Sequence, residues 1–170
     1  MELFFGVPAH PFFVHAPIVL LPIAAIATVV MAARPRWNIR ALPWLSGATA
    51  AIVVMLFMAI QSGQALADVA DGRAISGDIT DHETLGQQTL IISIVWLVAL
   101  VAAAVLSRRQ QAPSALSADA ATPSPFAQPA QIVTIVAAAV SIAATIWLIR
   151  TGHAGAESHW VGVINLIENS

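Results

Sequence analysis

The chain has 170 residues, of which 58% are hydrophobic and only 9% are charged, and its mean hydropathy is +0.81. Soluble domains have about 25% charged residues, so this composition excludes an ordinary soluble globule. A net charge of −2 excludes a nucleic-acid binder, which needs a basic surface, and the absence of cysteine excludes disulfides, thiolate metal sites and a cysteine nucleophile. The sequence therefore predicts a small integral protein of the lipid bilayer.

Four apolar stretches follow one another along the chain, near residues 12–33, 42–60, 85–106 and 132–149. A helix needs about 20 mostly apolar residues to cross a hydrocarbon core of roughly 30 Å, and lipid leaves helices as the way to satisfy the backbone. The sequence thus predicts an all-α, integral membrane four-helix bundle that forms a single domain over residues 1–170. Residues 107–131 are rich in Pro, Ala and Ser and are expected to be a flexible linker.

The arginines predict the orientation of the bundle, because positively charged short loops stay in the cytoplasm. The two connections on one side carry Arg34, Arg36, Arg40, Arg108 and Arg109, whereas the other side has Arg73, Arg150 and most of the acids. We therefore expect both termini to be extracytoplasmic, in the inner (cytoplasmic) membrane of a bacterium. Because Met1-Glu2 is not a basic segment, we expect the first span to be retained rather than cleaved as a signal peptide.

The histidines all fall on the outer side in this topology, at positions His10, His15, His82, His153 and His159. His15 lies inside the apolar run of the first span, and ionisable groups at such depth usually face the bundle interior. His10 and His15 are five residues apart, so they would not share one face of a helix that is regular through Pro11, but Pro11 permits a turn there and removes that constraint.

Polar and small residues form stripes on the third and fourth spans. The first stripe consists of His82, Gly86, Thr89 and Ser93, and the second of Thr134, Ala138, Ser141 and Thr145, continued by Gly152. Spacings of three and four place each set on one helix face, and such faces let membrane helices approach closely. We expect both stripes to face the interior.

Imidazole is a ligand for transition metals and haem iron, and it carries protons near neutral pH. Three chemistries fit: a haem b held by two histidines, a divalent metal held by three or more with a carboxylate such as Glu157, or an interfacial proton relay. We expect His15 and His82 to be the cofactor ligands. The candidate metal-binding set is His10, His15, His82 and His153, for a transition metal such as Cu, Zn or Fe. The alternative for each histidine is that it only places its polar edge among lipid headgroups.

The motif His10-Pro11 with Val14-His15-Ala16-Pro17-Ile18 resembles the opening of the DUF2231 domain, a family of uncharacterised four-helix bacterial membrane proteins. The resemblance continues through a Gly-and-Asp segment at 63–68, through His82, and through the glycine-containing segment 152–156. Residues 157–160 depart from the family's pattern, so His153 is carried over and His159 is not. Some related proteins join this domain to a Rieske iron–sulfur domain, which implies electron transfer.

These features favour a redox or metal-binding subunit that handles electrons or metal ions with an extracytoplasmic partner. The alternative is a non-catalytic structural or assembly subunit, and a third possibility is a small transporter or proton pathway, which would want ionisable groups near the bilayer midplane. No paired nucleophile and base is visible in the sequence, which favours a protein without an enzymatic activity of its own. Gly47-x-x-x-Ala51 is a candidate contact for a homo-oligomer.

Overall fold

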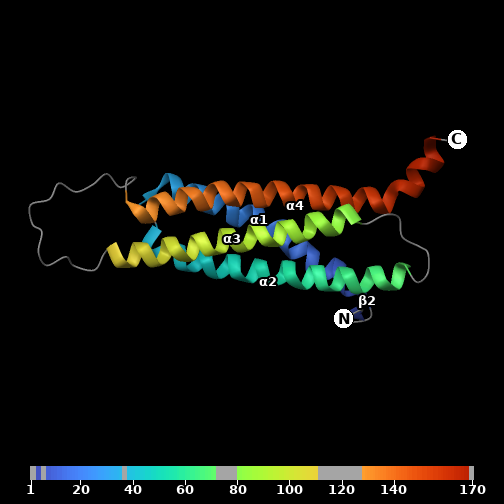
Figure 1. The fold of residues 1–170 in the computed structure, drawn as a ribbon, viewed down its shortest axis with the longest axis horizontal. Helices are drawn as coiled ribbons and strands as arrows, with labels where there is room; N and C mark the ends of the chain where they lie inside the picture. The colour runs from blue at the N-terminus through green and yellow to red at the C-terminus, as the bar shows by residue number, and fades with distance from the viewer. Residues whose placement is uncertain (1–2, 5–6, 36–37, 72–79, 111–127, 169–170) are drawn as a thin grey trace, which may run out of the picture.

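The computed structural model describes residues 3–4, 7–35, 38–71, 80–110 and 128–168. These residues form four long helices that run side by side along one axis (Figure 1). The helices are α1 (Ala9–Ala33), α2 (Asn38–Asp71), α3 (Thr80–Gln110) and α4 (Pro129–Glu168). Two short strands, β1 (Leu3–Phe4) and β2 (Val7–Pro8), pair antiparallel just before α1. The predicted all-α four-helix architecture is confirmed, with this small hairpin as an addition.

Each helix contains a segment long and apolar enough to cross a membrane, as predicted. These segments are Phe13–Ala33, Arg40–Ala65, Thr80–Gln110 and Pro129–Glu157. Each helix extends beyond the apolar run that the sequence predicted for it. A helix that is already formed adds one backbone hydrogen bond with each further residue, polar or not. The expected linker is shorter at both ends for this reason: residues 107–110 belong to α3 and 129–131 to α4, while 111–127 lie outside the described residues.

The charged residues at the two ends of α3 match the dipole of the helix. Its first turn contains Asp81 and Glu83, and its last turn contains Arg108 and Arg109. Acids near a helix N-terminus and bases near its C-terminus complement the helix dipole. Residues 84–107 between them contain no charged side chain, so the same charges also mark the two ends of the membrane-crossing part.

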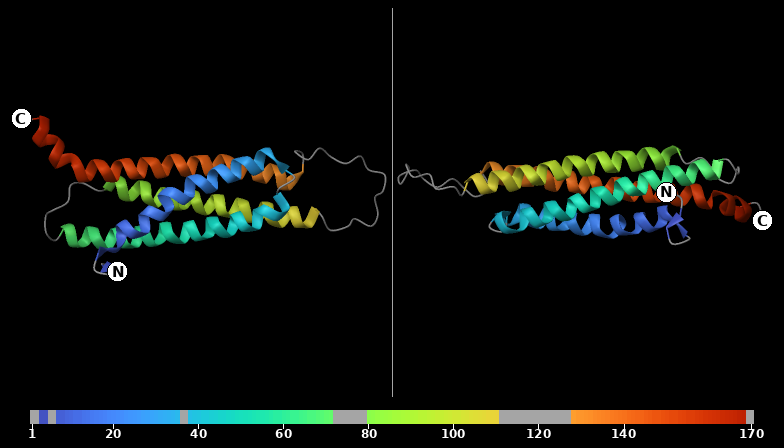
Figure 2. Two further views of the ribbon diagram at one scale, coloured as in Figure 1. Left: turned by 180° about the vertical axis from the view of Figure 1, so that it is seen from behind. Right: turned by 90° about the horizontal axis from the view of Figure 1, so that it is seen from below.

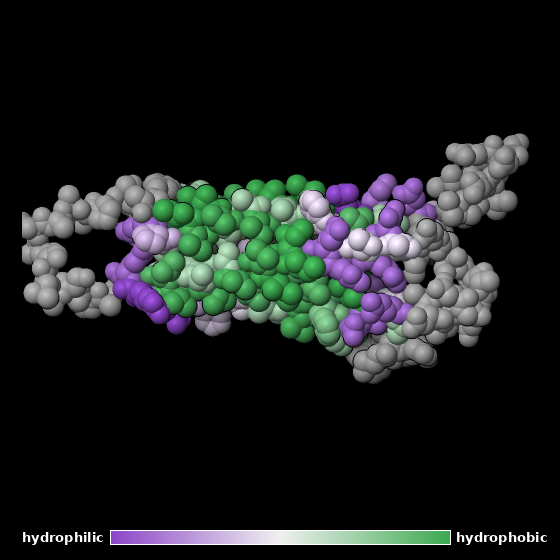
Figure 3. Space-filling view, in the orientation of Figure 1, coloured by the Kyte–Doolittle hydropathy of each residue, from purple (hydrophilic) through white to green (hydrophobic). Residues whose placement is uncertain are grey.

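The helices form a closed cycle in which each one packs against its neighbours in the chain and α4 returns to α1. Figure 2 shows the bundle from two further sides. The core is built from Leu, Ile and Ala with Met31 and Trp96, and its members include Leu21, Leu42, Ile52 and Ala137. Many large aliphatic side chains are instead exposed, and Figure 3 shows an apolar band around the middle with hydrophilic residues at both ends. This surface is suited to lipid.

Several buried hydroxyl groups line the interior and bond to their own helix, although the buried Thr49 hydroxyl has no hydrogen-bond partner among the described residues. Thr28, Ser93 and Thr134 each donate to the carbonyl four residues earlier at 2.8 Å. Such bonds satisfy polar groups where no water is available. The two predicted stripes are confirmed at Thr89, Ser93, Thr134, Ala138 and Ser141, which are buried, whereas Gly152 is exposed and the prediction there is wrong.

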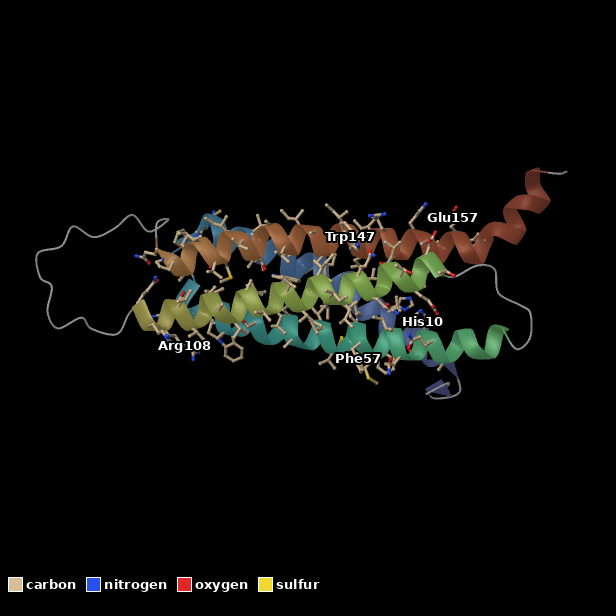
Figure 4. All side chains as sticks on the ribbon, viewed as in Figure 1. His10, Phe57, Arg108, Trp147 and Glu157 are labelled. Carbon is tan, nitrogen blue, oxygen red and sulfur yellow. The ribbon has the colours of Figure 1, made fainter. Side chains whose placement is uncertain are left out.

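The histidines and most of the arginines lie at opposite ends of the bundle. Figure 4 shows His10 and Glu157 toward one end and Arg108 at the other. At the arginine end, the buried Gln131 amide of α4 donates to the Ala32 carbonyl of α1, which fastens the two helices together. Gly47 is exposed there with nothing near it, and its part in an oligomer remains a prediction.

Candidate metal centre

Two of the predicted histidines meet at one end of the bundle. His10 is the second residue of α1 and His82 is the third residue of α3, and their ring centroids lie 6.2 Å apart with the ring planes at 88°. Both side chains are half-buried. Since α1 and α3 are not neighbours in the helix cycle, this contact reaches across the bundle.

Each imidazole is bonded to a backbone carbonyl of the helix beside it. His10 Nδ1 lies 2.8 Å from the Ala59 carbonyl oxygen, and His82 Nδ1 lies 2.9 Å from that of Thr151. A carbonyl oxygen only accepts, so Nδ1 carries the hydrogen and donates it. In the neutral ring, Nε2 then has a free lone pair, which is the arrangement typical of metal-ligating histidines.

The carbonyl that holds His82 belongs to a turn of α4 that is itself fixed. The Thr151 hydroxyl donates to the Trp147 carbonyl at 2.8 Å and lies 3.0 Å from the hydroxyl of Thr89 on α3. The Thr89 hydroxyl also lies 2.8 Å from the Leu85 carbonyl oxygen, so its single hydrogen is shared between that carbonyl and the Thr151 hydroxyl. These bonds tie α3 to α4 directly beneath the imidazole, so the position of the His82 ring depends on both helices.

Two glycines make room for the two rings. A Cβ on Gly63 would lie 3.0 Å from both Cε1 and Nδ1 of His10. A Cβ on Gly155 would lie 2.8 Å from Nδ1 and 2.9 Å from Cε1 of His82. Real Cβ atoms essentially never approach as closely as the position at Gly155, and the contact at Gly63 would be tighter than nine in ten real Cβ contacts, so the lack of a side chain favours the observed place of each imidazole.

The two halves of the site repeat one arrangement. His10 bonds the carbonyl of Ala59 and packs on Gly63, while His82 bonds the carbonyl of Thr151 and packs on Gly155. In both cases the glycine lies four residues after the carbonyl, on the same helix face. Sequence reasoning noted both glycines only as part of the family resemblance and gave neither a role in the site, although each closes a small-xxx-small pair near the end of a span, which is a signal for close approach.

Burial shapes the charge state of His10, which lies before the membrane-crossing segment that begins at Phe13. Loss of hydration lowers the pKa of His10 below its ordinary value of 6.5. The bond to the Ala59 carbonyl raises the pKa in part, and the neighbouring His82 lowers it again. The net effect favours the neutral imidazole, which is the form that ligates metals.

The structure does not bring the other predicted histidines into this pair. The His15 side chain is exposed, so the expectation that it faces the interior is wrong, and the partner of His82 is His10. The physical reason is the five-residue spacing, which turns His15 away once His10 points inward. His153 is also exposed, and the side chain of His159 lies outside the described residues. Metal binding by His15 or His153 remains a prediction.

The predicted set of three or more ligands is not assembled in the described part of the chain, where no group of three His, Asp or Glu residues is placed to share an ion. Glu157, the candidate carboxylate, is exposed on α4. What the described residues do present is one pair of imidazoles with fixed tautomers.

Comparison with known proteins supports the resemblance seen in the sequence. A family model described as "Predicted membrane protein (DUF2231)" matches residues 6–166. No curated protein and no solved structure matches the chain. The match includes both histidines of the pair and both glycines.

Proposed function

The chain belongs to the DUF2231 family of predicted membrane proteins, and on that premise we propose that it is a membrane redox subunit whose His10 and His82 hold the iron of one haem b. The observation that carries this proposal is the pair of imidazoles from diagonally placed helices, each with Nδ1 bonded to a carbonyl.

The separation of the rings supports two ligands on one ion. A metal–imidazole bond is about 2 Å, and the ring nitrogen lies about 1 Å from the ring centroid, so ligands on opposite sides of an ion have centroids roughly 6–6.5 Å apart. The observed separation is 6.2 Å. A structural zinc site usually has four protein ligands and a catalytic zinc site has three, whereas two histidines are enough to ligate a haem iron.

The surrounding residues would position such a centre and tune it. The carbonyls of Ala59 and Thr151 orient the rings and raise their basicity as ligands. Gly63 and Gly155 keep the ring edges clear of side chains. A bound haem iron would supply one-electron transfer, while His10 and His82 would hold it and the surrounding helices would set its dielectric environment.

The position of the histidine pair is suited to electron exchange with a partner protein at the membrane surface. Both histidines lie at the start of a membrane-crossing helix, at the end opposite to Arg108. Positively charged short loops stay on the cytoplasmic side, so we expect the arginine end to face the cytoplasm. We therefore infer that the histidine pair is on the extracytoplasmic side of a bacterial inner membrane. An extracytoplasmic redox protein would then be the partner.

The test is an absorption spectrum of detergent-purified protein expressed with haem precursor, oxidised and then dithionite-reduced, with metal analysis of the same sample. We expect a Soret band with sharp reduced α and β bands that disappear in His10→Ala and in His82→Ala. The matched controls are His15→Ala and His153→Ala, whose exposed side chains lie outside the pair; both should keep the spectrum.

The controls make the outcomes distinct. A spectrum that survives both pair variants, or that is lost in His15→Ala, would overturn the assignment of ligands. A colourless protein with stoichiometric copper, zinc or iron, lost in the pair variants, would keep the pair and replace haem by a bare ion.

A structural role is the second candidate, because the hydrogen bonds of the two histidines also join neighbouring helices in pairs. His10 of α1 is bonded to α2, and His82 of α3 is bonded to α4. If the histidines only join helices, the wild-type protein should be colourless and free of metal. Both pair variants should then unfold at lower temperature than the wild type.

A further inference from the structure

A groove on the outer surface of α3 and α4 has no part in the histidine pair. It has a volume of about 530 Å³, and its walls include Asp81, Leu85 and Gln88 from α3 and Ile149, Arg150 and His153 from α4. Arg150 and His153 flank the Thr151 turn but are exposed, whereas His82 contacts that turn from the other side. The groove is thus a separate feature at the same end of the bundle.

One wall of the groove is held in a fixed arrangement. The indole N–H of Trp147 donates to the Gln88 side-chain oxygen at 2.7 Å, which joins α4 to α3. The guanidinium carbon of Arg150 lies 5.1 Å from the centroid of the Trp147 ring, within range of a cation–π interaction. The positive charge of Arg150 is therefore positioned at the groove edge by an aromatic ring that is itself anchored.

The groove lies near one end of two membrane-crossing helices, where lipid headgroups are expected. Asp81 is in the first turn of the membrane-crossing helix α3, and Arg150 is seven residues before the end of the crossing segment of α4. Below the charged residues, the exposed side chains of Ile142, Ile146 and Ile149 form an apolar surface along α4. A ligand here would meet charge at one end and lipid-like surface at the other.

We propose that this groove binds one phosphatidylethanolamine molecule. Its phosphate pairs with the Arg150 guanidinium, its primary ammonium pairs with the Asp81 carboxylate, and an acyl chain lies along the α4 isoleucines. The argument is charge complementarity, since one groove presents both a cation and an anion. Phosphatidylglycerol has no cation for Asp81, and the methylated ammonium of phosphatidylcholine has no hydrogen to donate.

The test is native mass spectrometry of the full chain, delipidated in detergent and offered an equimolar mixture of the three phospholipids with identical acyl chains. We expect the wild type to retain one phosphatidylethanolamine in preference to the other two. Because a hydrogen bond to a charged group contributes about 1.5–3 kcal/mol, Arg150→Gln should lower this retention by about tenfold or more. Asp81→Asn should abolish the preference for ethanolamine over glycerol while phosphate binding remains.

The matched control is Arg108→Gln, which removes an arginine from the opposite end and should leave retention unchanged. Equal retention of the three lipids by the wild type would overturn the proposal, as would undiminished retention in Arg150→Gln. If Arg150→Gln fails to fold, Arg150→Lys keeps the charge with a weaker stack on Trp147, and Asp81→Asn alone still decides headgroup preference. None of these outcomes depends on haem, because they are read from lipid mass alone.

Discussion

At the scale of single residues, the histidine pair separates two roles that a ring nitrogen can have. Nδ1 of His82 bonds the Thr151 carbonyl, while Nε2 has the free lone pair. An asparagine at this position offers an amide N–H near the place of Nδ1 but no nitrogen lone pair. Structural and ligating roles therefore respond differently to the same substitution.

We predict that His82→Asn keeps most of the thermal stability of the metal-free protein but loses haem. His82→Phe removes the donor as well, and the lost hydrogen bond should cost about 1 kcal/mol of the free energy of unfolding. Thermal unfolding followed by circular dichroism, together with the reduced spectrum, checks both effects. Retention of the spectrum in His82→Asn would rule out His82 as a ligand.

Burial of His10 predicts a pH dependence of stability in the metal-free protein. The pKa of His10 is lower in the folded chain than its ordinary value of 6.5, so folding favours the neutral ring. This contribution is fully present above pH 6.5 and is lost as the pH falls through the folded pKa. We expect the unfolding temperature to fall between pH 7.5 and pH 5, and to fall less in His10→Asn. Equal pH dependence in the two proteins would contradict this cause.

At the scale of helices, α2 and α4 each present a carbonyl and, one turn later, a glycine to an imidazole. A Cβ would lie 2.8 Å from the ring of His82 at Gly155, which real Cβ atoms essentially never show, and 3.0 Å from the ring of His10 at Gly63, where the ring would have to shift slightly. Nearby Gly152 is exposed and has nothing within 4 Å of its Cβ position. Gly155 is therefore the position at which close packing on His82 can be tested, and Gly152 in the same segment of α4 is its control.

We predict that Gly155→Ala displaces His82, weakens its bond to Thr151 and lowers haem occupancy. Gly152→Ala should leave occupancy unchanged and should raise stability slightly, because Ala is better than Gly in a helix by about 1 kcal/mol. The ratio of Soret absorbance to protein absorbance measures occupancy in both variants. If the two alanine variants behaved alike, close packing on Gly155 would not be what positions the ring.

At the scale of the whole molecule, the two ends of the bundle differ in charge, and from this difference we predict which end faces the cytoplasm. Arg108 and Arg109 end α3 at one end, and Glu157 lies toward the other. The chain has no cysteine, so single cysteines can be introduced without background. We predict that Glu157→Cys in intact cells reacts with a membrane-impermeant maleimide and that Arg109→Cys reacts only after the membrane is opened. The reverse pattern would place the histidine end in the cytoplasm.

The sequence by itself determined the four membrane-crossing helices, because about 20 apolar residues in lipid leave the backbone no other way to satisfy its hydrogen bonds. It also determined that histidines and most arginines separate to opposite ends, since residue order along antiparallel helices fixes depth. Spacing placed Thr89 and Ser93 on an interior face, and burial confirms this.

Only the tertiary structure decided which histidines meet. Depth in the apolar run favoured His15, yet the rotation of α1 about its axis turns His10 inward and leaves His15 exposed. That rotation is set by packing against α2, where Gly63 admits the His10 ring and the Ala59 carbonyl receives its N–H. Spacing aligns residues within one helix, but it contains no information on which helices adjoin or which faces they turn to each other.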